Sequence, residues 1–145
     1  MRRAAALVRL SRDHHESLVA AQRLRRATAT GSIDACAVFL AFWDRGGARH
    51  FRVEEEVLLP AFARWGDAYE PLVARTLCDH VAIRIRIREL RENRDVAIAD
   101  LHRLGDLLAA HVRMEERELF PLIERTIPAG ELDAVADTVE QAERR

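Results

Sequence analysis

Apolar residues recur every three or four positions along almost the whole chain, and this spacing is the period of an α-helix. The stripes predict four long helices and a shorter fifth, separated by short polar, Gly- or Pro-containing breaks. Residues 83–88 alternate Ile and Arg as a strand would, but the flanking positions keep the helical stripe. The predicted helices span about residues 3–28, 33–65, 71–91, 96–125 and 131–143.

Local signals predict where these helices end and bend. Gly31 is expected to end the first helix, and Ser32 to cap the second. The pair at residues 46–47 is Gly-Gly, which predicts a bend in the second helix, and Pro60 is expected to end or kink it. Residues 67–70 resemble a capping box for the third helix. Short turns between the helices imply that consecutive helices pack antiparallel. The length of the chain suits a single domain, so an all-α domain over residues 1–145 is predicted.

One motif occurs twice in register and shows that the chain consists of two tandem halves. Residues 50–60 (HFRVEEEVLLP) and 111–121 (HVRMEERELFP) both fit H-x-R-x-E-E-x-x-L-x-P. An Asp-His pair precedes each copy, at residues 13–14 and 79–80. Each half therefore contributes one upstream His and one His-x-x-x-Glu.

These residues are candidates for a metal site. Residues four apart lie on one helix face, so each His-x-x-x-Glu pair can point at a single spot, and His14 and His80 lie in the apolar stripes of the other two helices. Ionised carboxylates in a core need a partner or a metal. The alternative is that the pairs are exposed or form His–Glu hydrogen bonds. Duplication in register favours the metal site, with ligands His14, His50, Glu54, His80, His111 and Glu115.

The types of donor atom limit which metal ions could bind. Imidazole and carboxylate ligands without thiolate admit iron, manganese or zinc. Two six-coordinate irons offer about twelve positions, of which four His and two bridging Glu fill about eight. The remaining positions are open to water, an oxo or hydroxo bridge, or a small ligand such as O2. An open pair suits a redox-capable centre better than a structural zinc site, which is normally closed.

The pattern H…HxxxE…H…HxxxE, with E-x-x-L-x-P after each second motif, resembles the hemerythrin-like (HHE cation-binding) family over about residues 5–125. The resemblance implies an up-down-up-down four-helix bundle (about residues 3–125). The amphipathic pattern of the last helix (about 131–143) predicts that it docks outside this bundle. The resemblance also implies two non-haem iron ions, oxo- or hydroxo-bridged, with manganese or zinc as less favoured metals. The four His would be terminal ligands, and Glu54 and Glu115 would bridge the irons.

One departure from the oxygen-carrying hemerythrins concerns the third helix. Those proteins have a further histidine four residues from another, whereas Thr76 and Arg84 flank His80 at that spacing. Reversible O2 storage is therefore not the favoured function. His15, Glu55, Glu116 or water are candidates for the unfilled position, although a ~100° turn per residue directs Glu55 and Glu116 towards a neighbouring helix or solvent. His102 is expected at the surface. Arg52 and Arg113 are expected to form salt bridges. The alternative is that they hydrogen-bond to the ligand carboxylates and orient them.

Composition excludes several functions. All 23 basic residues are Arg, which rules out lysine chemistry such as a Schiff base. A net charge of −1 gives no reason to expect nucleic acid or an anionic membrane as partner. The chain has no stretch of about 20 apolar residues, and a soluble, cytoplasmic protein with reduced Cys36 and Cys78 is expected. Ile85 points away from the predicted core, which suggests a homodimer contact.

Three hypotheses follow. The first is a di-iron protein that binds or senses O2, a related oxidant or iron. The second is an enzyme, a peroxide-consuming di-iron oxidoreductase; it ranks lower because the sequence shows no dedicated acid or base, so catalytic activity stays open. The third is a metal-free helical module that recognises a partner.

Overall fold

The computed structural model describes residues 3–93 and 95–145, and within them it contains helices and no strand. The long helical runs are α1 (Ala5–Arg25), α2–α4, α5 (Pro71–Glu92), and α6–α7, followed by α8 (Ala129–Glu143). The second run comprises α2 (Ser32–Phe42), α3 (Ala48–Val53) and α4 (Leu59–Ala63), and the fourth comprises α6 (Ile98–Met114) and α7 (Phe120–Thr126). A 3₁₀ turn, η1 (Ala29–Gly31), precedes α2. Single π turns join the pieces: η2 (Trp43–Gly47), η3 (Glu54–Leu58) and η4 (Glu115–Leu119).

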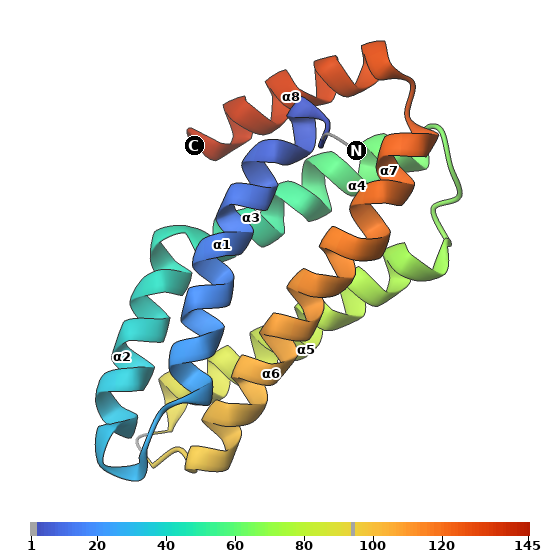
Figure 1. Ribbon diagram of the computed structural model, residues 1–145. Coiled ribbons are helices and arrows are strands. Elements are labelled where there is room, and N and C mark those ends of the chain that lie inside the picture. Colours follow the sequence, from blue (N-terminus) through green and yellow to red (C-terminus); the bar gives the residue numbers. More distant parts are fainter. Residues whose placement is uncertain (1–2, 94) are drawn as a thin grey trace.

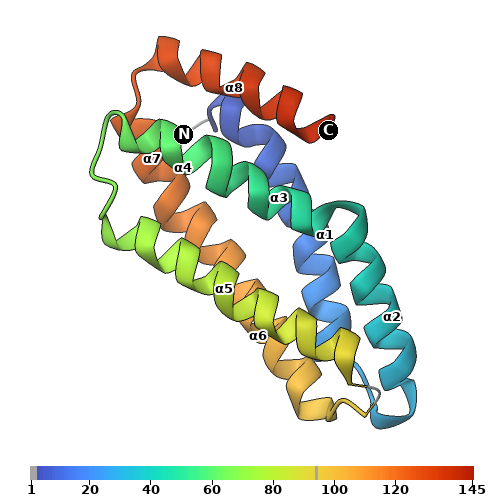
Figure 2. The ribbon, with the colours of Figure 1, turned by 180° about the vertical axis from the view of Figure 1, so that it is seen from behind.

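The four runs form an antiparallel up-down-up-down bundle, which confirms the predicted fold class (Figure 1). The helix α8 crosses one end of the bundle and packs against α1, α3 and η3 (Figures 1 and 2). Its apolar side chains Leu132 and Val139 are buried there. The short C-terminal helix therefore covers the end of the core, as expected.

The second run bends where the sequence places Gly46 and Gly47 (Figure 1). A Cβ on Gly47 would lie 2.8 Å from the Trp43 ring, so only glycine allows this close approach. The backbone N–H of Ala48 donates to the carbonyl of Trp43, five residues earlier, and this π turn changes the helix direction.

At Pro60 the helix does not end but continues to Ala63, near the predicted limit of residue 65, directly after the π turn η3. Two other local predictions differ from the structure. Gly31 has φ −101°, not a left-handed cap, and Ser32 is the first residue of α2, where its hydroxyl donates to the Ala29 carbonyl. No capping box forms before α5, because Glu70 is itself the N-cap and accepts from the backbone N–H of Leu72.

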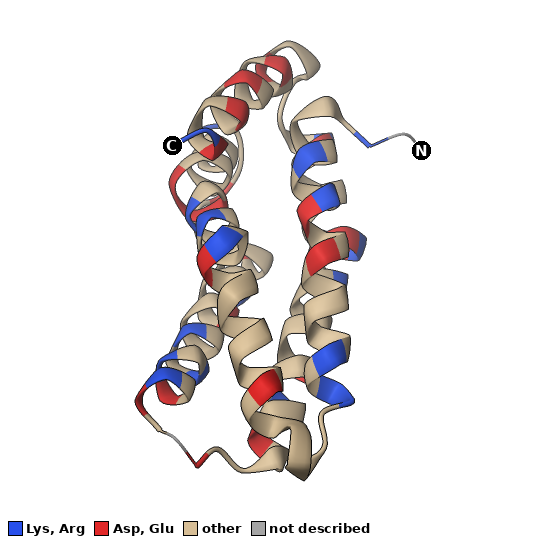
Figure 3. Cartoon of the chain, turned by 90° about the vertical axis from the view of Figure 1, so that its left-hand side faces the viewer, with Lys and Arg blue, Asp and Glu red and all other residues tan. Residues whose placement is uncertain are grey.

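The apolar core consists of two clusters, one at each end of the bundle. The cluster under α8 includes Leu7, Phe62 and Phe120, and the other includes Leu24 and Phe39. Buried polar side chains lie between them along the helices. Positions of both charge signs are spread along all the long helical runs (Figure 3). Cys36 and Cys78 are free, and within the described ranges no helix has the length and apolar content needed to span a membrane.

Candidate metal centre

The six candidate ligands meet in the layer between the two apolar clusters. His14 comes from α1, His50 from α3, His80 from α5 and His111 from α6, while the two Glu begin the π turns η3 and η4. All six side chains are buried, with exposed fractions between 0% and 4%. The helical stripe therefore placed every one of these residues on an inward face.

The ligand atoms form two overlapping groups. One comprises His14, His50, Glu54 and Glu115, and the other comprises Glu54, His80, His111 and Glu115; within each, the atoms lie within 4.8 Å of one another. Glu54 Oε1 lies 3.1 Å from His50 Nε2 and 3.5 Å from His80 Nε2. Glu115 Oε1 lies 2.6 Å from His111 Nε2 and 3.7 Å from His14 Nε2. Each carboxylate thus lies between one histidine of each group, which is the arrangement of a bridging ligand.

The duplicated Pro explains the π turns at the two glutamates. Pro60 and Pro121 have no N–H for the carbonyl four residues earlier, which a continuous α-helix requires. In each copy one extra residue is accommodated, and the residue before the Pro donates to the carbonyl of Glu54 or Glu115. Single π turns of this kind are frequent at functional sites. The motif E-E-x-x-L-x-P therefore encodes both a candidate ligand and the local geometry that presents it.

The donor atoms facing the centre have no hydrogen-bond partner. They are the four histidine Nε2 atoms and both oxygens of Glu54 and of Glu115. The short nitrogen–oxygen distances lack hydrogen-bond geometry, so they do not satisfy these atoms. Buried polar atoms without partners are costly, and eight of them converging on one spot fit a metal site. A satisfied His–Glu hydrogen-bond pair, the alternative from sequence, is not what the side chains form.

In each of the four candidate-ligand histidines, the other ring nitrogen, Nδ1, contacts a carboxylate. His50 Nδ1 lies 3.0 Å from Asp13 Oδ2, and His111 Nδ1 lies 3.1 Å from Asp79 Oδ2. His14 Nδ1 is 2.7 Å from Glu116 Oε1, and His80 Nδ1 is 2.6 Å from Glu55 Oε2. An ionised carboxylate only accepts, so each Nδ1 carries the proton and each Nε2 keeps its lone pair for a metal.

Two arginines and two phenylalanines surround the histidines and the carboxylates that contact their Nδ1 atoms. Arg3 binds Glu116 at 3.0 Å and also binds Glu124, and its guanidinium lies over the Phe120 ring, on which His14 stacks.

On the other side Arg84 binds Glu55 at 2.6 Å and lies over Phe51, on which the His80 ring stacks at 3.8 Å. These contacts fix the two outer glutamates, which in turn orient the imidazoles.

The buried carboxylates raise the pKa values of neighbouring histidines, so the cluster favours bound positive charge. Burial lowers the pKa of His50, but the Glu54 charge and the Asp13 carboxylate outweigh it and hold that pKa well above 6.5. Burial likewise opposes the charge of Glu115 and the Asp79 carboxylate at His111, yet its pKa is raised to about 10. Burial raises the pKa of Glu54, but His50 beside it holds that pKa well below its usual range. Without metal, protons supply the positive charge.

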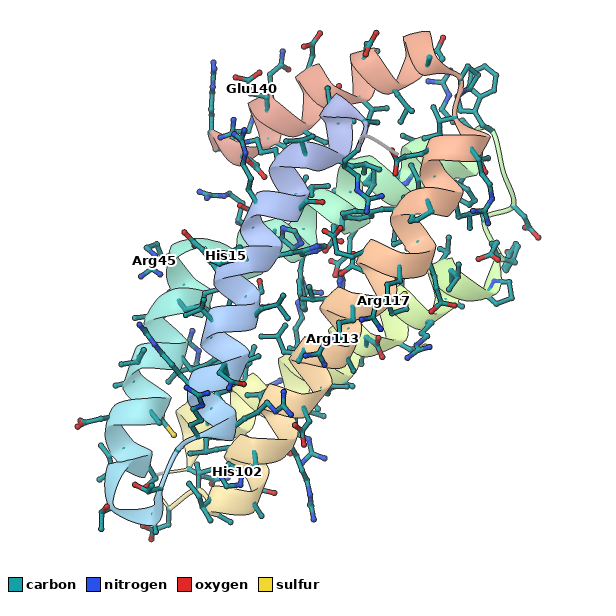
Figure 4. All side chains as sticks on the ribbon, in the orientation of Figure 1. His15, Arg45, His102, Arg113, Arg117 and Glu140 are labelled. Carbon is teal, nitrogen blue, oxygen red and sulfur yellow. The ribbon has the colours of Figure 1, made fainter. Side chains whose placement is uncertain are left out.

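The structure assigns the remaining candidates to other places. His15 and Arg113 lie on the outside of the bundle (Figure 4), and neither Arg52 nor Arg113 forms an ion pair within the described part of the chain. The prediction of salt bridges for these two arginines is therefore wrong. His102 Nε2 lies 2.9 Å from the Ala27 carbonyl, at the edge of the bundle. Glu55 and Glu116 face a neighbouring helix, the first of the two orientations expected.

Sequence reasoning missed how four further residues support the site. The Asp of each Asp-His pair was visible in the motif, but its contact is with the other histidine of its own half, 37 or 32 residues away. The sequence pattern marks Arg84 only as a position where the oxygen carriers could have a histidine, and does not predict its contact with Glu55. Nothing in the sequence singles out Arg3, because its contact with Glu116 joins residues 113 positions apart.

Together, the bundle and the buried His/Glu cluster define a helical protein with a metal-binding site in its core. The Hemerythrin HHE cation binding domain model matches residues 6–123. The chain belongs to this family, which confirms the resemblance seen in the motifs. No curated protein and no solved structure shows a significant match to the chain.

Proposed function

We propose that the chain binds two iron ions between Glu54 and Glu115 and uses their open coordination positions to bind or sense O2 or a related small oxidant. The observation that carries the proposal is the pair of overlapping ligand groups with unpartnered donor atoms. Each ion would receive two imidazole nitrogens and one oxygen from each shared carboxylate. A six-coordinate ion then keeps about two positions for water or a small ligand.

The charge of the site supports two ions rather than one. Six carboxylates contact the histidines, and two arginines contact the outer carboxylates. Arg3 also binds Glu124, so with neutral imidazoles these seven carboxylates and two arginines carry five negative charges, which two divalent cations reduce to one. One divalent ion would leave three negative charges on a site whose two central carboxylates, Glu54 and Glu115, are fully buried, and this is costly.

Burial supports a small ligand. The six ligand side chains are at most 4% exposed, so a large substrate has no direct contact with the donor atoms. Redox-capable metal ions at this site supply electron transfer and Lewis acidity. The chain's own contribution is to direct each Nδ1–H to a carboxylate acceptor, to keep each Nε2 lone pair available, and to exclude bulk water.

The residue four positions before His80 supports sensing or iron response over reversible storage. Thr76 is fully buried, and its hydroxyl donates to the Leu72 carbonyl at 2.8 Å. Neither Thr76 nor Arg84, the residues four positions before and after His80, supplies the further imidazole that the oxygen carriers have at this spacing. The two ion positions have matching sets of two His each, which leaves both ions open.

The test is metal content per chain after expression with ample iron and purification without chelator. We expect close to two irons in the wild type, and loss of iron in His50→Ala with the helical circular dichroism retained. His15→Ala is the matched control, because it removes an exposed imidazole next to a ligand. A wild type that stays metal-free after reconstitution with ferrous iron, or a His50→Ala variant with full iron content, would overturn the proposal.

A further inference from the structure

The helix α5 is apolar on two opposite faces. Its inward face packs Val73, Ile83 and Ile87 in the core around His80. Its outward face carries Leu77, Val81 and Ile85, which are 40%, 67% and 55% exposed. A surface helix normally has one apolar stripe, so the second stripe of α5 lacks a partner within the chain. Figure 2 shows α5 towards the viewer with no other helix over it.

This stripe differs from the other exposed apolar side chains that the structure describes. Val19, Trp65 and Tyr69 lie on separate segments, and Ile33 and Val38 are five residues apart on α2. Single exposed apolar residues of this kind are ordinary. Among residues 3–93 and 95–145, α5 alone exposes large apolar residues on three successive turns, which form a continuous surface for a second helix.

The spacing of the stripe is symmetric about its centre. Leu77 lies four residues before Val81, and Ile85 lies four residues after it. A two-fold axis at Val81 would pack Val81 on its own copy and Leu77 on Ile85 of the second copy. A contact in which one patch matches itself is the isologous interface of a C2 dimer.

The charges beside the stripe favour the antiparallel orientation. Arg75 lies six residues before Val81 and Glu89 eight residues after it, on one edge of the stripe. Antiparallel packing about Val81 places Arg75 of one copy on the same edge as Glu89 of the other, whereas parallel packing places the two copies of each charge on opposite edges. Arg84 and Arg88 already bind Glu55 and Glu92 in the same chain, and Arg86 lies 3.8 Å from Glu89, so these arginines add little repulsion between copies.

We propose that the chain forms a homodimer through antiparallel packing of the outward α5 stripe Leu77–Val81–Ile85 on a second copy. The surface lies on the helix that carries His80, on the side opposite the metal centre. The dimer requires no metal in the interface, so its test is independent of the proposed iron chemistry.

The first experiment is sedimentation of the full chain over a wide concentration range. We expect a monomer–dimer equilibrium that Val81→Arg shifts entirely to monomer. Ile33→Arg is the matched control, because Ile33 is 77% exposed on α2 and should leave the dimer intact. A wild type that is monomeric at every concentration, or a dimer insensitive to Val81→Arg, overturns the proposal.

Cysteine cross-linking then tests the geometry in a Cys36→Ser, Cys78→Ser background. Val81→Cys should form an intermolecular disulfide rapidly, because the residue lies on the axis. Leu77→Cys or Ile85→Cys alone should not, since two copies of either residue would lie about 12 Å apart along the helices.

A mixture of the Leu77→Cys and Ile85→Cys chains should cross-link. Ile33→Cys gives the collision background. Val81→Cys no faster than that background, or efficient self-cross-linking of Leu77→Cys, overturns the antiparallel dimer.

Discussion

The half of the site on α1 and α3 and the half on α5 and α6 surround their histidines with the same kinds of side chain, but they do so partly from different positions. The carboxylate contacts obey the sequence repeat: Asp13 corresponds to Asp79, and Glu55 to Glu116. Each of these four residues occupies the same place in its half. The sequence duplication therefore explains the positions of the candidate ligands and of the carboxylates that contact the histidine Nδ1 atoms.

The arginine and phenylalanine do not follow the repeat. Phe51 directly follows His50, whereas Phe120 lies nine residues after His111. Arg84 lies four residues after His80 on the same helix, whereas Arg3 comes from the start of the chain, eleven residues before His14. Both halves nevertheless stack an imidazole on a phenyl ring and hold the outer glutamate with a guanidinium. The arrangement in space is shared where the sequence positions are not.

The largest expected effect comes from the residues that both halves share. Glu54→Gln or Glu115→Gln should remove both ions, because each carboxylate lies between the two groups and Gln is a poor bridge. Measured by metal analysis, either variant should retain almost no iron with its helical circular dichroism intact. A Glu variant that keeps one tightly bound ion would show that the two positions do not share that carboxylate.

The next effect distinguishes the halves. Asp13→Ala and Asp79→Ala should each weaken one ion by about 10- to 100-fold and leave the other, because each carboxylate orients a single ligand imidazole. Stepwise titration of the metal-free protein with a spectroscopically visible divalent ion measures both steps. Equal weakening of both steps by one variant would contradict the separation of the halves.

Both halves should respond alike to pH. In the metal-free protein the pKa of His50 is raised by Glu54 and Asp13, and that of His111 to about 10 by Glu115 and Asp79, in each case against the effect of burial. The histidines therefore hold protons at neutral pH, and each must lose its proton to bind metal. Affinity should rise with pH, by up to about tenfold per unit for each proton displaced. Proton release measured during metal titration checks this, and pH-independent affinity would contradict it.

The fold and the convergence of the six candidate ligands could be predicted because each rests on local information. The helical stripe, the His-x-x-x-Glu spacing and the in-register repeat all involve residues within one helix or its copy. The contacts of Arg3, and those of Glu116 with His14, join opposite ends of the chain, so only packing reveals them. The π turns at Glu54 and Glu115 also escaped local rules, since a Pro predicts an end or a kink and does not specify how the helix continues through it.

The smallest expected effect comes from α8, whose main packing contacts are with α1, α3 and η3. Glu143 is buried, binds Arg9, and lies beside Asp13; burial and the Asp13 charge raise the pKa of Glu143. Glu143→Ala should weaken the His14/His50 ion by a few-fold, because Asp13 loses a neighbour that restrains it, and should leave the His80/His111 ion unchanged.

Glu140→Ala is the matched control for Glu143→Ala, since Glu140 lies on the same helix at the outside of the molecule and binds Arg144 (Figure 4). The readout is again the stepwise metal titration, with helicity as the check on docking of α8. If Glu143→Ala weakens both ions equally, its role is general stabilisation by α8. A change confined to the first half would show that a helix outside the repeat makes the two ion positions unequal.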